Sequence, residues 1–156
     1  ETLTVYLSPV PVTGGPIPQT AIGGNTGTFT PVLRFGGAST GITYDTNGQV
    51  GVYSRVGKLV TFSIFIQLTS NGSATGAATI AGLPIALNAT TNAYVTHNVF
   101  FFTTGTGASF LPQTYSPAGS TALNINKLQT DGTNGALTEA DFGDTASFII
   151  TGSYLA

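Results

Sequence analysis

The chain has 156 residues, of which 41% are apolar and only 6% are charged, with a formal net charge of −2 and no cysteine. The absence of cysteine excludes disulfides, zinc–thiolate sites and thiol catalysis. Four basic residues give no electrostatic footprint for nucleic acid, and no stretch approaches the ~20 continuous apolar residues of a membrane helix, so we expect neither nucleic-acid binding nor membrane insertion. The polar residues are mainly threonine, serine, asparagine, glutamine and glycine, a composition that predicts an all-β protein.

The first 28 residues carry little signal for regular structure beyond a short strand at 1–8. Four prolines fall within residues 9–18, and "QTAIGGNTGT" follows. Proline fixes φ and removes a main-chain donor, and glycine interrupts regular structure, so this segment should be extended. We therefore predict a neck or stem over 1–28 and one β domain over 29–156. Because the sequence begins at Glu1 without a secretory signal, we expect it to be a piece of a longer protein.

From residue 28 onward, strand patterns alternate with turn residues. Pro31 indicates an edge or a strand start, Asn47-Gly48 predicts a hairpin turn, and Gly57 predicts a tight turn. A single helical turn capped by Thr138 is expected before the last strand. The predicted strands are 28–35, 42–45, 49–56, 58–68, 75–83, 93–102, 121–129 and 145–156. About eight antiparallel strands with turns between them predict a jelly-roll-like β-sandwich.

The strand "KLVTFSIFIQL" has the clearest pattern in the chain. Large apolar residues occupy every second position from Val60 to Leu68, which predicts one fully buried face. The chain has only two lysines to protect exposed strand edges, yet ten phenylalanines to cover. We therefore expect a symmetric oligomer in which Phe65, or some of Phe100–Phe102, faces a neighbouring copy.

Two segments of the sequence resemble a recurring part of tail proteins from tailed bacteriophages. One is "FTPVLRFGGASTGITYD" with the following "GVYSRVGKLVTFSIFIQLTSNGSATGAATIAGLP", and the other is the closing "SFIITGSYLA". The residues that carry the resemblance are the aromatic-Thr-Pro strand at Phe29–Pro31, the Phe-Gly-Gly turn at 35–37, the hairpin at Tyr53–Val60 and the Gly-Leu-Pro stop at 82–84. Coverage is roughly 29–84 and 145–156, and the middle third departs from the pattern.

The resemblance implies the tip of a tail fibre or the knob of a tail needle. Such a domain would be a homotrimer at the distal end of the virion tail, assembled in the host cytoplasm. It would contact a bacterial surface glycan or outer-membrane protein, and its N-terminal side would join the rest of the tail. We expect no cofactor and no enzymatic activity. The alternatives are a carbohydrate-binding module or capsid-like jelly roll and, third, a polysaccharide-degrading tail enzyme.

The predicted connection 103–119 is our candidate for recognition, because long loops on rigid scaffolds often carry function. Phe110, Gln113 and Tyr115 offer apolar and hydrogen-bonding contacts suited to a sugar or protein surface. Packing of this loop on the domain or on a neighbouring subunit is the alternative.

The basic residues Arg34, Arg55 and Lys58 would form a small-anion site if their strands are neighbours. A cation within an apolar strand is costly to bury alone, so a salt bridge, for example from Arg34 to Asp45, within or between subunits, is the other interpretation.

His97 and the late carboxylates are the remaining candidates for chemistry. His97 is the only histidine, and the chain lacks the G-x-S-x-G elbow, so we expect neighbouring polar groups to satisfy this side chain. The carboxylates Asp131, Glu139, Asp141 and Asp144 could pair for glycoside hydrolysis or hold calcium, but their spacing matches no calcium loop. We therefore expect a solvated acidic turn and assign no metal and no catalytic residue.

Overall fold

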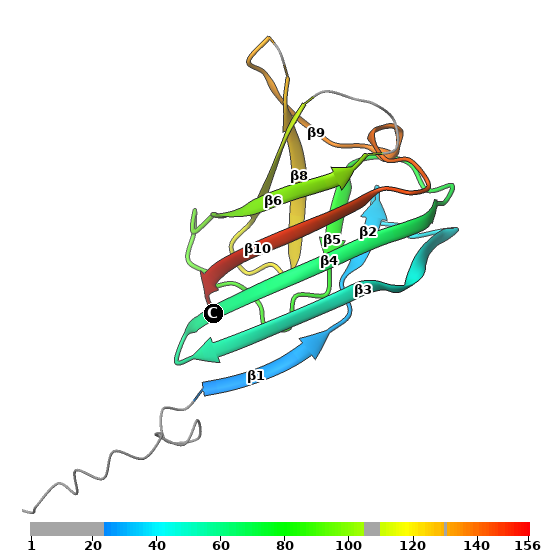
Figure 1. Cartoon of the computed structure of the whole chain (residues 1–156). Helices are drawn as coiled ribbons and strands as arrows, with labels where there is room; N and C mark the ends of the chain where they lie inside the picture. The colour runs from blue at the N-terminus through cyan, green and yellow to red at the C-terminus, as the bar shows by residue number, and fades with distance from the viewer. Residues whose placement is uncertain (1–23, 105–109, 130) are drawn as a thin grey trace, which may run out of the picture.

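The structure is a computed structural model that describes residues 24–104, 110–129 and 131–156. Its elements are β1 (Gly24–Phe29), β2 (Val32–Phe35), β3 (Ile42–Val56), β4 (Leu59–Asn71), β5 (Ala78–Ala81), β6 (Val95–Thr103), β7 (Leu111–Ser116), β8 (Ala122–Leu128), β9 (Asn134–Ala136), the 3₁₀ turn η2 (Glu139–Asp141) and β10 (Ser147–Leu155). The prediction of an all-β fold is confirmed (Figure 1). β1 pairs with β3, so residues 24–28 of the predicted stem belong to the sheet.

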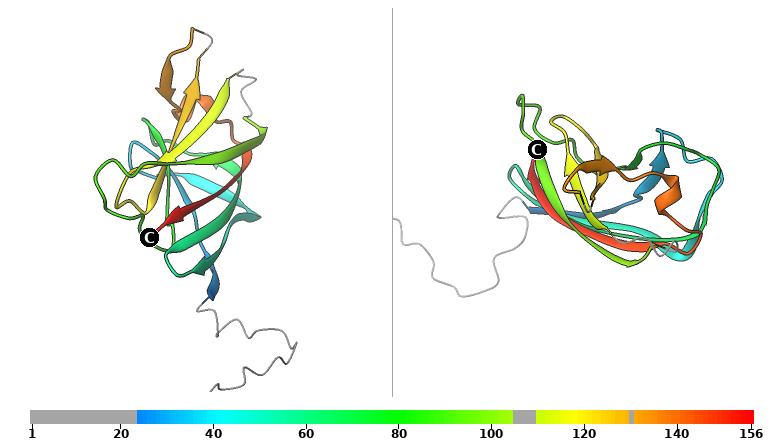
Figure 2. Two further views of the ribbon diagram at one scale, coloured as in Figure 1. Left: turned by 90° about the vertical axis from the view of Figure 1, so that its left-hand side faces the viewer. Right: turned by 90° about the horizontal axis from the view of Figure 1, so that it is seen from above.

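All strand pairs are antiparallel, and one strand order, β1-β3-β4-β10-β6-β7-β8-β5-β2, runs through the domain. This continuous sheet bends at β6 and curls into a half-barrel, so that β8, β5 and β2 lie across from β3 and β4 (Figure 2). The antiparallel part of the prediction is therefore confirmed. The two separate sheets of a jelly-roll-like sandwich are not observed, because β6 pairs with β10 at one end and with β7 at the other.

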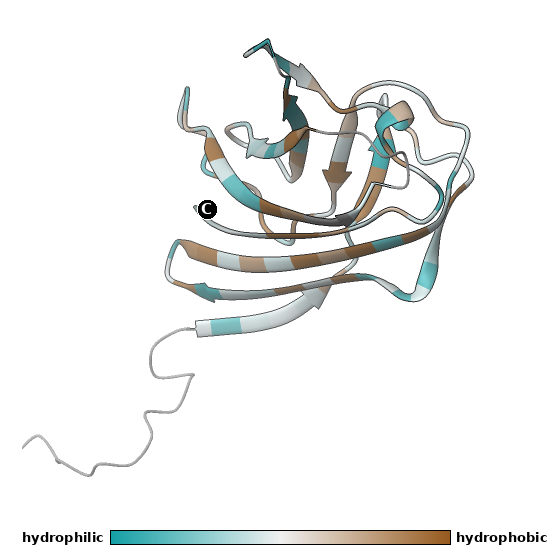
Figure 3. Cartoon of the chain, turned by 45° about the horizontal axis from the view of Figure 1, so that its top comes forward, coloured by the Kyte–Doolittle hydropathy of each residue, from teal (hydrophilic) through white to brown (hydrophobic). Residues whose placement is uncertain are grey.

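The alternating strand β4 supplies the floor of the core, as predicted. Val60, Phe62, Ile64, Ile66 and Leu68 are all buried, with at most 5% of any of these residues exposed. Figure 3 shows the apolar and polar residues alternating along this ribbon. The neighbouring strand β10 adds Phe148 and Ile150, and the strands across the half-barrel contribute Leu33, Phe35, Ile80, Leu123 and Ile125. The core thus lies inside the half-barrel.

The edge strand β2 and the part of β3 that β1 does not cover are joined by side chains instead of a strand ladder. The Tyr44 hydroxyl accepts a 2.9 Å hydrogen bond from the Leu33 amide, and the Gln49 Nε2 donates a 2.9 Å hydrogen bond to the Pro31 carbonyl. The strand predicted over 28–35 is interrupted here, because β1 ends at Phe29 and β2 begins at Val32. Proline, which lacks an N–H, fits this break between two edge strands.

The predicted hairpin at Asn47-Gly48 is wrong. Both residues lie inside the 15-residue strand β3, where the register shifts between Tyr44 and Gln49, which pair with Leu68 and Ile66. The segment is therefore a bulge of β3. Gly48 is needed there for close approach, because a Cβ atom at this position would lie 2.5 Å from the Gln67 carbonyl oxygen. The hairpin between β3 and β4 instead turns at Gly57, with φ of 60°, as predicted.

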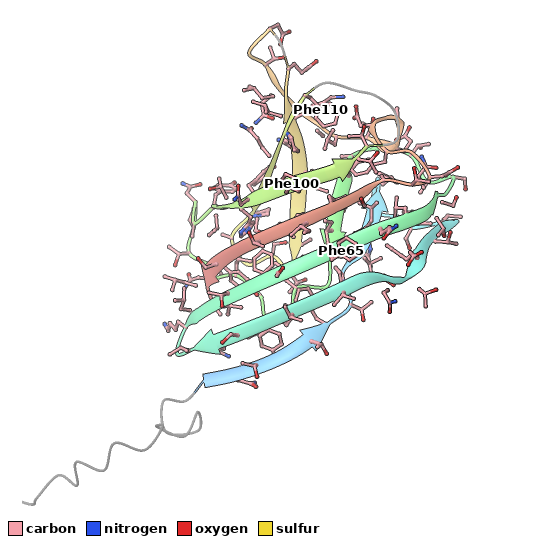
Figure 4. The ribbon with its side chains drawn as sticks, in the orientation of Figure 1. Phe65, Phe100 and Phe110 are labelled. Atoms are coloured by element: carbon pink, nitrogen blue, oxygen red, sulfur yellow. The ribbon has the colours of Figure 1, made fainter. Side chains whose placement is uncertain are left out.

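A row of apolar side chains crosses the outer face of the sheet. Val50 pairs with Phe65, Phe65 with Ile149, and Ile149 with Phe100. Cross-strand partners point to the same side of a sheet, so these four side chains are neighbours outside the core. Val50 is 43% and Phe100 is 61% exposed. We call Val50, Phe65, Ile149 and Phe100 the outer apolar row; Figure 4 labels two of its members. The side chains of Phe101 and Phe102 lie outside the described part.

Candidate functional site

The candidate site forms where β6 leaves β7. Val95–His97 of β6 pair with Thr114–Ser116 of β7, whereas Asn98–Phe101 and Thr103 pair with β10. The two strands therefore part at Asn98, and a groove of about 640 Å³ opens between them. We call it the fork groove. It is lined by Tyr94, Thr96, His97, Asn98, Val99, Pro112, Gln113, Thr114, Tyr115, Asn126 and Asn134.

The lining of the fork groove combines polar and apolar surface, and among the described residues it carries no aspartate, glutamate, lysine or arginine. Four side-chain amides contribute both donors and acceptors, and among the described residues none of them hydrogen-bonds to another protein group: Asn98, Gln113, Asn126 and Asn134. Two tyrosine rings, Tyr94 and Tyr115, lie with centroids 6.1 Å apart and planes tilted by 57°. Such a surface can hydrogen-bond and stack without forming an ion pair.

His97 faces the interior next to this groove. Its Nε2 lies 3.0 Å from the Ser116 Oγ, and its ring meets Phe62 edge-on with centroids 5.1 Å apart. Among the described residues, the buried Nδ1 has no hydrogen-bond partner. Gly152 makes room for the ring, since a Cβ atom there would collide with Nδ1. Burial lowers the pKa of His97 from 6.5 to about 4, so the imidazole is neutral at pH 7.

The contact between His97 and Ser116 resembles the pairing of a base with a nucleophile. Ser116 is fully buried, and no carboxylate within the described ranges holds the imidazole Nδ1. The expectation that polar neighbours satisfy this histidine therefore holds for one ring nitrogen only.

Of the three predicted binding residues, the structure brings two together. Gln113 and Tyr115 alternate on the same face of β7 and line the groove, whereas Phe110 lies outside it, with its ring centroid 5.6 Å from the Lys127 Nζ (Figure 4). Residues 111–116 form a strand, so the predicted loop 103–119 is wrong over that range. Sequence reasoning missed Tyr94, Asn98 and the other amides. The sequence pattern that could have identified them is the alternation of polar residues along 94–98 and 122–128, which places these residues on one face of each strand.

The basic residues do not converge. Arg34 lies on β2 near Tyr44; burial raises the pKa of Tyr44, and the hydrogen bond from the Leu33 amide and then the charge of Arg34 oppose this effect. Arg55 lies much further along β3: its partner on β4, Val60, is eight residues from Leu68, the partner of Tyr44, which is roughly 26 Å along the strand. Its Nε donates a 2.7 Å hydrogen bond to the Gly57 carbonyl, and Lys58 follows in the turn. Within the described ranges the one salt bridge joins Lys127 to Asp141 at 2.6 Å, so an Arg34–Asp45 pair is not seen within the chain.

The late carboxylates bind groups of the protein itself. Asp141 accepts hydrogen bonds from Lys127 and from the Thr138 amide. Glu139 accepts one from the Gly76 amide, and Asp144 from the Asn71 amide. Hydrogen bonds from the Thr133 hydroxyl and amide lower the pKa of Asp131. Around η2 the carboxylates therefore tie the turn to β4 and β8, and the described residues contain no cluster suited to a metal ion.

Comparisons with known proteins support the fold. No protein-family profile matches the sequence, and no curated protein matches it. The crystal structure of the Dettilon tailspike protein (gp208) is similar, with a TM-score of 0.68 and 22% sequence identity. The similarity covers 84% of this chain and 23% of the tailspike chain. The two proteins thus share this fold. Among the described residues, no helix is long and apolar enough to cross a membrane.

Proposed function

We propose that this chain is a receptor-binding domain of a phage tail appendage that contacts the bacterial cell surface during adsorption. The observation that carries the proposal is the fold similarity to a phage tailspike protein over 84% of the chain. The phage-tail resemblance at Phe29–Pro31 and in the closing strand rests on sequence and supports it independently. The domain would be part of the virion tail at its distal end, with its N-terminal side directed toward the rest of the tail.

The contact would be non-covalent. Support comes from the carboxylates around η2, which are engaged by a lysine or by main-chain amides, and from the burial of Ser116 beside His97. Several copies acting together would hold a virion even where each single contact is weak.

Binding to whole cells tests the function directly. The fluorescently labelled protein is incubated with a panel of bacterial strains, and bound label is measured by flow cytometry. We expect saturable binding to a subset of strains, with competition by unlabelled protein. A receptor-binding role is ruled out if no strain binds the folded protein better than it binds the same protein unfolded by heat.

We expect the homotrimer that the phage-tail resemblance implies, with the outer apolar row as the surface where the copies meet. Its four side chains form a contiguous apolar surface on a chain with few charges, which a neighbouring copy would cover. We expect a native mass of about three times the 15.8 kDa chain by light scattering after size exclusion. Phe65→Asp should reduce the mass to that of one chain, because a carboxylate would be desolvated in the interface.

Gln67→Asp is the matched control for Phe65→Asp. It places the same charge two residues further along β4 on the outer face, outside the outer apolar row, and should leave the trimer intact. A monomeric wild-type protein, or a Phe65→Asp protein that remains a trimer, would contradict this interface.

A further inference from the structure

We propose that the fork groove binds an uncharged oligosaccharide. This inference rests on the proposed function, since it names the chemical class of the surface receptor. Three properties of the groove support it: its volume, the lack of charged side chains in its described lining, and amide side chains that make no hydrogen bond to other described protein groups. The volume of about 640 Å³ falls within the usual range for sites that hold small ligands.

The absence of formal charge in the lining selects against an ionic ligand. The nearby cation Lys127 is held by Asp141 at 2.6 Å and faces the interior side of β8, so it is not directed to a ligand in the groove. His97 is neutral at pH 7. An acidic sugar would lose hydration at its carboxylate without meeting a cation in the lining. An uncharged sugar avoids this cost.

Amides and sugar hydroxyls are complementary. A hydroxyl donates one hydrogen bond and accepts others, and a carboxamide does both within one planar group. Asn98, Gln113 and Asn126 come from three different strands, and their amides make no hydrogen bond to other described protein groups. They are therefore available to a ligand that lies across the strands. Tyr94 and Tyr115 add ring surface on which the C–H groups of a pyranose can pack.

Strand addition by a protein ligand is less favoured here. A peptide would pair with the part of β7 that β6 leaves, at Leu111–Gln113. Pro112 lies in the middle of this part and has no N–H to donate. A ligand in the fork groove would therefore be bound through side chains, and the amide side chains there can exchange hydrogen bonds with sugar hydroxyl groups.

A glycan array that carries uncharged and acidic bacterial surface oligosaccharides tests this proposal. We expect the wild-type protein to bind uncharged oligosaccharides. Gln113→Ala and Tyr115→Ala should each weaken binding about tenfold or more, the effect of losing roughly 1.4 kcal/mol. Leu111→Ala is the matched control: Leu111 lies on the same face of β7, is 66% exposed and does not line the groove, so this variant should bind like the wild type.

Selective binding of acidic glycans, no binding to any glycan, or wild-type binding by the Gln113→Ala protein would overturn the sugar site. Gln113 is exposed, so its variant should fold normally even if Tyr115→Ala does not.

Binding to cells treated with periodate or with protease distinguishes the sugar site from the receptor-binding role. Periodate cleaves the vicinal diols of sugars and should abolish cell binding, whereas protease treatment of the cells should leave it unchanged. The opposite result would assign a protein receptor, and the tail function would stand without the sugar site. If the array binds the protein but no bacterial strain does, the sugar site stands and the receptor-binding role is wrong.

Discussion

Replacing Phe142 with alanine should lower the free energy of unfolding by about 3–5 kcal/mol, the usual cost of deleting a buried aromatic ring. Only 2% of Phe142 is exposed. Its ring lies 5.4 Å from that of Phe35 on β2 and 5.9 Å from that of Phe148 on β10. The ring thus joins the segment after η2 to strands on both sides of the half-barrel. Urea denaturation at fixed protein concentration measures the change.

Leu111→Ala serves as the control for Phe142→Ala. Leu111 is a large apolar residue that is 66% exposed, so its loss should change the unfolding free energy by about 0.5 kcal/mol or less. Equal effects of the two variants would mean that the aromatic cluster does not hold the 137–146 segment on the core.

Acid should destabilise the domain through His97. The folded protein holds the His97 pKa at about 4, against 6.5 for an unburied histidine. As the pH falls below 6.5, the unfolded chain takes up a proton that the folded chain resists, so the unfolding free energy falls with pH. The stabilisation is fully present above pH 6.5 and lost near pH 4. The change from 6.5 to about 4 sets an upper limit of about 3 kcal/mol on this loss, because partial access of solvent to the imidazole reduces it.

Two measurements isolate the contribution of His97 from that of the carboxylates. An NMR titration of the imidazole reports its pKa directly, and we expect a midpoint near 4. His97→Asn removes the titrating group, so its unfolding free energy should vary less between pH 6.5 and pH 4 than that of the wild type. A midpoint near 6.5, or the same pH dependence in both proteins, would contradict a buried neutral imidazole.

The fork groove shows how a surface site can depend on a change of strand partner. β6 is long enough to pair with β7 at its start and with β10 along the rest of its length. Where it changes partner, the strands splay and expose side chains from β6, β7 and β8 to one shared space. The side chains of Phe142 and His97 are buried inside the half-barrel, and the two stability predictions therefore probe the scaffold that supports the groove.

Some features of this protein could be predicted from the sequence alone because they depend on local periodicity. The alternation from Val60 to Leu68 predicted which face of β4 is buried, since successive side chains of a strand point to opposite sides. The closing strand was also predicted, and the turn at Gly57 followed from the tendency of glycine to form tight turns. The low charge and the abundance of threonine and glycine predicted the all-β class.

Other features were decided only by the tertiary structure, because they depend on which strands become neighbours. Asn47-Gly48 has the sequence of a hairpin, but β4 runs past it and pairs on both sides, so the dipeptide becomes a bulge. β7 contains Pro112 and many polar residues, and it is a strand because β8 pairs with it. Gln113 and Tyr115 were identifiable as candidates from their side-chain chemistry. Their meeting with Tyr94, Asn98 and Asn126 required the fork between β6 and β7, since long-range pairing brings together residues that no local pattern connects.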